Sequence, residues 1–234
     1  MTFKIKMFAD GADLDEIRKL RLNSKVSGFT TNPTLLAKSG VRDYSEFARE
    51  AIKIASPLPI SFEVISDEMG EMYDQAKKIH SWGDNVYVKI PVTNTKGIST
   101  TPLISKLAKE GVALNVTAVM TIKQVKEVCA NLDSEVPSVV SIFAGRIADT
   151  GIDPIPLMKE SLEIVSQLKR SELLWASPRE ILNLIQAESI GCHIITMTTE
   201  LWNKIDNIGS NLEEFSLATV KMFYDDAIKS KLSI

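Results

Sequence analysis

The chain of 234 residues contains only two cysteines and two histidines. Cys129 and Cys192 lie far apart in unlike contexts, so we expect no disulfide and interpret both as small buried residues in a reducing cytoplasm. His80 and His193 are isolated and have no ligand partners at metal spacing. The sequence therefore predicts neither a disulfide framework nor a metal site.

Other absences narrow the class further. No apolar run approaches the length of a membrane-spanning helix, and the first residues form an alternating strand pattern instead of a signal peptide. A net charge of −3 leaves no basic excess for a nucleic-acid surface. We therefore expect a soluble cytoplasmic protein that binds neither membranes nor nucleic acid.

Short apolar strands alternate with longer amphipathic segments along the chain, which predicts a (β/α)₈ barrel as a single domain over residues 1–211. An open doubly wound sheet is the alternative, but no Gly-x-Gly-x-x-Gly turn follows the first strand. The expected strands are Phe3–Ala9, Val26–Thr30, Pro59–Val64, Asn85–Ile90, Val112–Val116, Ser138–Phe143, Glu172–Ala176 and Cys192–Met197. The expected helices span residues 13–22, 43–56, 68–81, 99–110, 121–131, 153–169, 178–188 and 199–206.

A further amphipathic segment, Leu212–Leu232, follows the eighth unit and belongs to a C-terminal region of residues 212–234. Its broad apolar face predicts a helix that the barrel does not need for closure. Two placements remain open for it, the outer wall of its own barrel and a neighbouring subunit.

Lys89 is the most informative single residue, because it lies near the end of an expected buried strand. Burial disfavours an ammonium group and promotes the neutral amine. A neutral amine attacks carbonyl carbons, so the position predicts Schiff-base chemistry. The alternative is a lysine whose ammonium extends from the strand end to water.

Polar side chains stand at the carboxyl ends of the expected strands, where barrel enzymes keep their chemistry. Because successive strand residues face opposite sides, Glu63, Lys89, Asn115, Thr117 and Ser141 are predicted to share the barrel interior. The full set of candidate site residues is Asp10, Asn32, Glu63, Lys89, Asn115, Thr117, Ser141, Arg146, Ser177 and Arg179.

Several of these residues also have an ordinary structural interpretation. Asp10 is compatible with a simple strand-to-helix turn that ends at an N-cap, Asp13. Asn32 precedes a proline, which is typical of turns. Arg146 and Arg179 are compatible with surface charges, but they follow the sixth and seventh strands, where barrels frequently bind phosphate.

Six motifs, taken in order, resemble the transaldolase family of class I aldolases over essentially the whole chain. The similarity is greatest to the short-chain branch, which also contains fructose-6-phosphate aldolases. The motifs are Phe8-Ala-Asp-Gly-Ala-Asp13, Thr30-Thr-Asn-Pro-Thr34, Tyr87-Val-Lys-Ile-Pro91, Leu114-Asn-Val-Thr117, Ser141-Ile-Phe-Ala-Gly-Arg-Ile147 and Trp175-Ala-Ser-Pro-Arg179.

The resemblance implies a role for each matching residue. Lys89 matches the Schiff-base lysine, and Asp10 matches the acid/base for the hydroxyl proton, although Gly11 replaces a hydroxyl residue common in relatives. Glu63 and Thr117 match the pair that holds a catalytic water. The residues matching sugar-binding groups are Asn32, Asn115 and Ser141, and those matching the phosphate site are Arg146, Ser177 and Arg179.

The implied activity is that of a transaldolase of the pentose phosphate pathway, which needs no cofactor. It moves a dihydroxyacetone unit from sedoheptulose 7-phosphate or fructose 6-phosphate to glyceraldehyde 3-phosphate or erythrose 4-phosphate. Glu63 and Phe143 favour this reaction, because the fructose-6-phosphate aldolases similar to this chain carry glutamine and tyrosine there. The alternatives are a lyase that releases dihydroxyacetone and a non-catalytic sugar-phosphate-binding barrel. The resemblance also implies a homo-oligomer, a pentamer or decamer, with the C-terminal helix at an interface.

Overall fold

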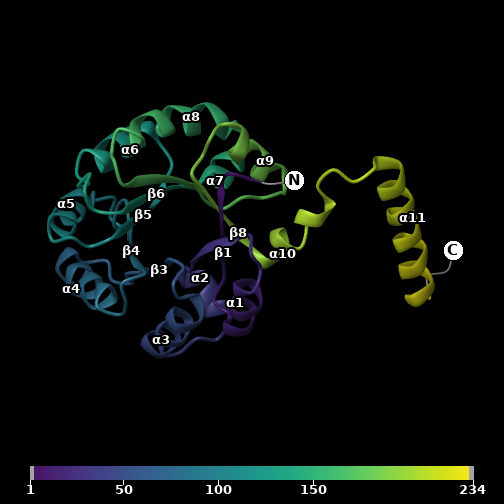
Figure 1. Ribbon diagram of the computed structural model, residues 1–234, viewed down its shortest axis with the longest axis horizontal. Helices are drawn as coiled ribbons and strands as arrows, with labels where there is room; N and C mark the ends of the chain where they lie inside the picture. The colour runs from purple at the N-terminus through teal and green to yellow at the C-terminus, as the bar shows by residue number, and fades with distance from the viewer. Residues whose placement is uncertain (1–2, 232–234) are drawn as a thin grey trace. The chain divides into compact units, whose positions relative to one another are not determined.

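A computed structural model describes residues 3–231 and contains eight parallel strands in a closed barrel of order β1 to β8 (Figure 1). The predicted (β/α)₈ fold is therefore confirmed, and the open doubly wound sheet is excluded. The strands are β1 Lys6–Asp10, β2 Val26–Thr30, β3 Ile60–Glu63, β4 Val86–Pro91, β5 Leu114–Val119, β6 Ser138–Ile142, β7 Ser171–Trp175 and β8 Ile194–Thr198.

Each strand is followed by helical structure, as the alternating pattern predicts. The main helices are α1 Leu14–Arg21, α3 Tyr44–Ala55, α4 Met69–His80, α5 Thr101–Lys109, α6 Ile122–Cys129, α8 Pro154–Val165, α9 Leu182–Ser189 and α10 Thr199–Trp202. The expected helix over 199–206 was too long, since α10 ends at Trp202 and a separate 3₁₀ turn, Ile205–Asn207, follows it.

Two short helices, α2 Pro33–Lys38 and α7 Ala144–Ala148, were not predicted from the sequence. Each is too short to show a clear helical period. α2 begins at Pro33, directly after the N-cap Asn32, whose side-chain oxygen accepts the Leu35 N–H at 2.9 Å. Asn32 and Pro33 therefore have the structural role that was expected of them, but they start a helix instead of forming a simple turn.

Side chains cap the first turns of several helices, including the N-cap expected at Asp13. Asp13 accepts the backbone N–H groups of Asp15 and Glu16 at the start of α1. At the start of α6, Thr121 and Gln124 form a reciprocal capping box. These caps satisfy N–H groups that a helix leaves unpaired at its first turn.

The core lies between the barrel and its surrounding helices. Alternate strand residues that point outward are almost fully buried, among them Phe62, Val88, Ile90, Val116 and Val140. The residues between them therefore point into the barrel, as the period of the strands requires.

Part of the barrel interior is filled by apolar side chains. Phe8, Val139, Leu174, Ala176 and Ile194 form a buried cluster there, and two partly buried aromatic residues, Tyr87 and Phe143, pack against it. This filling confines the open space to the two ends of the barrel.

The chain divides into two compact units, the first ending at Trp202 and the second beginning at Asn203, compared with the expected boundary after residue 211. The second unit contains α11 Leu212–Lys229, the extra C-terminal helix, whose N-cap is Asn211. None of the residues of α11 is buried. Leu232, the expected last residue of the segment, lies outside the described residues.

Two further observations concern the whole described chain. Among residues 3–231, no helix is both long enough and apolar enough to cross a membrane.

Cys129 and Cys192 are free and buried, and burial raises the pKa of the Cys129 thiol to about 11 and that of Cys192 to about 12. Both thiols therefore stay protonated at neutral pH, as structural cysteines do.

Candidate active site

A cavity of about 510 Å³ opens at the carboxyl ends of the strands, within the size range of small-molecule sites. Residues on every strand of the barrel line it. Of the candidate residues, those that line it are Asp10, Asn32, Glu63, Lys89, Asn115, Thr117, Ser141, Arg146 and Ser177. Arg179 is not among the lining residues.

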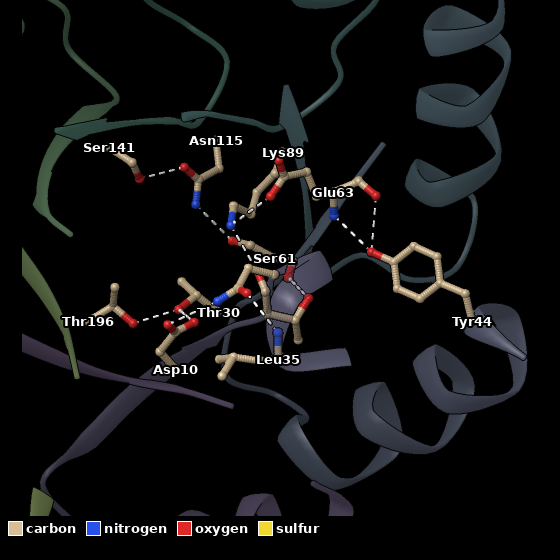
Figure 2. Close-up of polar contacts among 12 residues, drawn as sticks. Asp10, Thr30, Leu35, Tyr44, Ser61, Glu63, Lys89, Asn115, Ser141 and Thr196 are labelled. Atoms are coloured by element: carbon tan, nitrogen blue, oxygen red, sulfur yellow. Dashed lines mark hydrogen bonds and ion pairs between the residues drawn. The ribbon is translucent and has the colours of Figure 1, made fainter. Parts of the chain in front are cut away.

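Lys89 lies on the inner wall with 6% of its surface exposed. Its Nζ atom is 3.1 Å from Glu63 Oε2 and donates a hydrogen bond of 2.8 Å to the Thr31 carbonyl (Figure 2). Glu63 and Lys89 are register partners on β3 and β4, so adjacent strands bring the two charges together. The interpretation of Lys89 as a lysine that extends to bulk water is thereby excluded.

A chain of hydrogen bonds fixes the polar groups beside Lys89. Asn115 is its register partner on β5, and the Asn115 Nδ2 group donates to Ser61 Oγ at 3.1 Å. Ser141 Oγ donates in turn to Asn115 Oδ1 at 2.7 Å. Thr117, two residues further along β5, is buried and lines the same cavity. The bonds orient the Asn115 amide at the cavity wall.

Asp10 is held on the β1 side of the cavity by neighbouring hydroxyl and amide groups. Thr30 Oγ1 donates to Asp10 Oδ1 at 2.8 Å, and Asn32 Nδ2 donates to Asp10 Oδ2 at 3.3 Å. The Thr30 and Thr196 hydroxyl oxygens lie 2.5 Å apart, which links Asp10 to β8. Asn32 thus contacts the candidate acid/base as well as capping α2.

Burial raises the pKa of Asp10, although the Lys89 charge and the hydrogen bonds from Thr30 and Asn32 act in the opposite direction. The nearby Glu63 charge adds to the increase. A carboxyl group with a raised pKa gives and takes protons more readily near neutral pH. The position therefore suits an acid/base group.

The strand-end residues were identifiable from the sequence, but Thr30, Thr196 and Tyr44 were missed. Thr30 is the last residue of β2 and Thr196 lies two residues before the end of β8, so inward parity along these two strands would have found them. Tyr44 lies on α3, and no strand pattern indicates that its hydroxyl binds Glu63.

Arg146 lies on α7, directly after β6, and Ser177 lies in the loop after β7; both line the cavity. Gly145 allows these two segments to approach closely, because a Cβ atom there would come within 1.6 Å of the Ser177 carbonyl oxygen. Ser177 has a φ of 60°, a left-handed conformation that is unusual for a serine. The Arg146 guanidinium lies 5.6 Å from the centre of the Phe143 ring.

Arg179 takes a different position from Arg146. Its guanidinium forms an exposed ion pair with Asp149, in which the Nε donates to Oδ1 at 3.0 Å. The hydrogen bond with Arg179 holds the pKa of Asp149 below its usual range, with a smaller contribution from the Arg146 charge. The structure thus places Arg146 and Ser177 of the candidate phosphate site in the cavity and pairs Arg179 with a carboxylate.

Within residues 3–231, no group of three or more histidine, cysteine, aspartate and glutamate side chains is placed to hold a metal ion. The fold and cavity define the class of protein, a (β/α)₈ barrel with a buried lysine–carboxylate pair at its carboxyl-terminal mouth. Barrel enzymes keep their active sites at that end.

Comparison with known proteins identifies the family. The family model described as transaldolase/fructose-6-phosphate aldolase matches residues 7–233, and this chain belongs to that family. A probable transaldolase from Dehalococcoides mccartyi is 35% identical over 195 residues, which cover 82% of this chain and 86% of the relative. Probable transaldolase 2 from Listeria monocytogenes is 34% identical over 202 residues, which cover 86% of this chain and 88% of the relative.

Solved structures share the fold at much lower sequence identity. KGPDC from Streptococcus mutans aligns with a TM-score of 0.56 and 10% identity, covering 84% of this chain and 88% of that chain. A putative phosphonomutase from Burkholderia cenocepacia aligns with a TM-score of 0.59, also at 10% identity, and the alignment covers 93% of this chain and 94% of that chain. These two similarities concern the barrel fold alone, whereas the family supports an enzyme with transaldolase-like activity.

Replacing Asp10 by asparagine tests the raised pKa. The usual carboxyl pKa is 3.8, and the folded state has the higher value, so above pH 3.8 the folded state binds more protons than the unfolded state. At low pH Asp10 is protonated and does not destabilise the folded state. As the pH rises through the folded pKa, Asp10 ionises and the folded state loses stability. We expect Asp10→Asn to melt above the parent at pH 8, with a difference that shrinks towards pH 4.

Asp13→Asn is the matched control, because asparagine is an equally good N-cap for α1. Differential scanning calorimetry across this pH range measures the effect. A difference between Asp10→Asn and the parent that grows towards pH 4 would contradict the raised pKa.

Proposed function

We propose that the protein is a transaldolase that forms a Schiff base at Lys89. The observation that carries the proposal is the pairing of buried Lys89 with Glu63, 3.1 Å apart, in a cavity that Asp10 also lines. Buried acid and amine groups that converge on one cavity are typical of catalytic sites. The substrates we propose are the sugar phosphates of the pentose phosphate pathway, in the cytoplasm.

In the proposed first step, the Lys89 ammonium gives a proton to Glu63 and the free amine attacks the ketone carbon of the donor. Loss of water from the resulting carbinolamine gives an iminium ion, and Glu63 with Thr117 holds that water. The Glu63 carboxylate lies within direct proton-transfer distance of the amine. The family resemblance supports the assignment of the water to this pair.

Carbon–carbon cleavage follows at the iminium stage. The Asp10 carboxylate removes the proton of the hydroxyl next to the scissile bond, and that bond breaks beyond the dihydroxyacetone unit. Its electrons move into the iminium to give an enamine, while the hydroxyl-bearing fragment leaves as an aldose phosphate. The acceptor aldose phosphate then adds by the reverse steps, and hydrolysis frees Lys89.

The polar wall and the loop after β6 supply binding in this proposal. Asn32, Asn115 and Ser141 bind the sugar hydroxyls, and Arg146 with Ser177 binds the phosphate. Arg179 joins the phosphate site when its guanidinium exchanges the Asp149 carboxylate for phosphate oxygens, which an exposed ion pair permits at small cost.

Reduction with borohydride in the presence of fructose 6-phosphate tests the covalent step. We expect a three-carbon adduct on Lys89, located by peptide mass spectrometry, because the enamine is in equilibrium with an iminium that hydride reduces. The adduct is expected to disappear in Lys89→Arg. It is expected to persist in Lys6→Arg, whose ammonium is paired with Glu172 at the other end of the barrel. An adduct on another lysine, or none, would refute the mechanism.

The choice between transfer and release is tested by the acceptor. We expect fructose 6-phosphate turnover to accelerate at least about tenfold when erythrose 4-phosphate is present, because a transferase must keep its enamine until an acceptor arrives. Free dihydroxyacetone is measured in parallel by a coupled reductase. If it is released at the same rate with and without acceptor, the protein is an aldolase instead.

We also propose that the protein is a homo-oligomer, a pentamer or decamer. α11 supports this, since it carries the large apolar residues Phe215, Val220 and Phe223, which a second copy of the chain would cover. Native mass spectrometry is expected to give five or ten chain masses. Val220→Ser with Phe223→Ser is expected to lower that mass, and a monomeric parent would contradict the proposal.

A further inference from the structure

The regular backbone hydrogen bonding between β2 and β3 ends before it reaches Glu63. Phe29 pairs with Ile60 and Thr30 with Ser61 in the register of the two strands. Just past the end of β2, the Thr31 N–H still donates to the Ser61 carbonyl at 3.2 Å. In a regular parallel ladder, the Thr31 carbonyl would next accept the N–H of Glu63, two residues further along.

The two groups of that missing step have other partners. The Glu63 N–H donates to the Tyr44 hydroxyl oxygen at 2.9 Å, and the Thr31 carbonyl accepts from Lys89 Nζ at 2.8 Å. The Tyr44 hydroxyl in turn donates to the Glu63 carbonyl at 3.0 Å, so both backbone groups of Glu63 are bound to one side chain (Figure 2). The tyrosine hydroxyl thus replaces the strand as the partner of the Glu63 N–H.

Tyr44 is itself held firmly. It is the first residue of α3, and its ring packs edge-to-face against Phe62 at 6.1 Å and against Trp82 at 5.8 Å between ring centres. Burial raises the pKa of the Tyr44 hydroxyl, so the group keeps the proton that it donates to Glu63. Aromatic packing of this kind fixes a side chain in one position.

We propose that Tyr44 is a positioning residue for Schiff-base formation at Lys89. By binding the Glu63 N–H, its hydroxyl leaves the Thr31 carbonyl available as an acceptor for the Lys89 ammonium. It also fixes the backbone from which the Glu63 carboxylate reaches the same ammonium. Tyr44 therefore controls both contacts that the structure gives Lys89 Nζ, without itself lining the main cavity. The proposal rests on the proposed function.

Loss of the hydroxyl has a specific consequence. Without it, the partly buried Glu63 N–H lacks its acceptor, and an unpaired donor away from water is costly. We therefore expect the ladder to close by one further step. The Thr31 carbonyl then accepts hydrogen bonds from both the Glu63 N–H and the Lys89 ammonium. The Glu63 carboxylate moves with its backbone. Imine formation slows, whereas the binding of sugar phosphate is unaffected.

The experiment compares Tyr44→Phe with the parent in two assays. The first measures the rate of borohydride trapping at Lys89 with fructose 6-phosphate. The second measures binding of glucitol 6-phosphate by calorimetry, because this compound has no carbonyl and binds without forming an imine. Tyr73→Phe is the matched control, since its hydroxyl binds Glu110 on an exposed helix surface. Trp82→Phe alters the aromatic packing but leaves the two hydroxyl bonds.

We expect Tyr44→Phe to slow trapping about tenfold, because both hydrogen bonds to the Glu63 backbone are lost and only the N–H finds a new acceptor, with glucitol 6-phosphate binding unchanged within about twofold. Tyr73→Phe and Trp82→Phe are expected to trap at the parent rate, even if Trp82→Phe melts at a lower temperature.

Three results would overturn the proposal. The first is trapping in Tyr44→Phe at the parent rate, and the second is an equal loss of trapping and binding. The third is a slowing of trapping by about tenfold in Trp82→Phe, which keeps both hydroxyl bonds, and this result counts against the proposal even if Tyr44→Phe does not fold. Failure of the parent itself to form an adduct is a different result, because it refutes the proposed function and not the role of Tyr44.

Discussion

The ion pair between Lys89 and Glu63 is the constraint around which the site is built. An ammonium buried inside a barrel is costly unless it has charged and hydrogen-bonding partners. Glu63 provides the charge and the Thr31 carbonyl the hydrogen bond, and both come from neighbouring segments of the sheet. The second partner is available because β2 and β3 stop pairing there. An irregularity in the sheet is thus part of the environment of the lysine.

Two separate hydrogen-bond systems lie in the wall of the barrel around this pair. One runs from Asn115 to Ser61 and Ser141 across β3, β5 and β6. The other joins Asp10 to Thr30 and Thr196 across β1, β2 and β8. The rigid sheet therefore holds the candidate acid/base and the Asn115 amide, a candidate sugar-binding group, in position relative to the amine before substrate arrives. Such preorganisation reduces the rearrangement that a reaction requires.

The loops are less completely specified than the wall. Arg146 lies at the cavity, whereas Arg179 is paired with Asp149 at the exposed end of the following loop. Both arginines are equally recognisable in the sequence, since each follows a strand end by a few residues. Their positions differ because Arg179 reaches the Asp149 carboxylate in space, and no sequence pattern marks Asp149 as its partner.

The sequence by itself determined the barrel, because alternation of strands and helices and the two-residue period of each strand are local properties. The same period placed Glu63, Lys89, Asn115, Thr117 and Ser141 on one inner surface. Tertiary structure alone decided the contacts between them. The binding of Tyr44 to Glu63, of Lys89 to the Thr31 carbonyl and of Thr30 to Thr196 joins residues far apart in the chain or groups of the backbone. Such contacts depend on distances between elements, which no local pattern records.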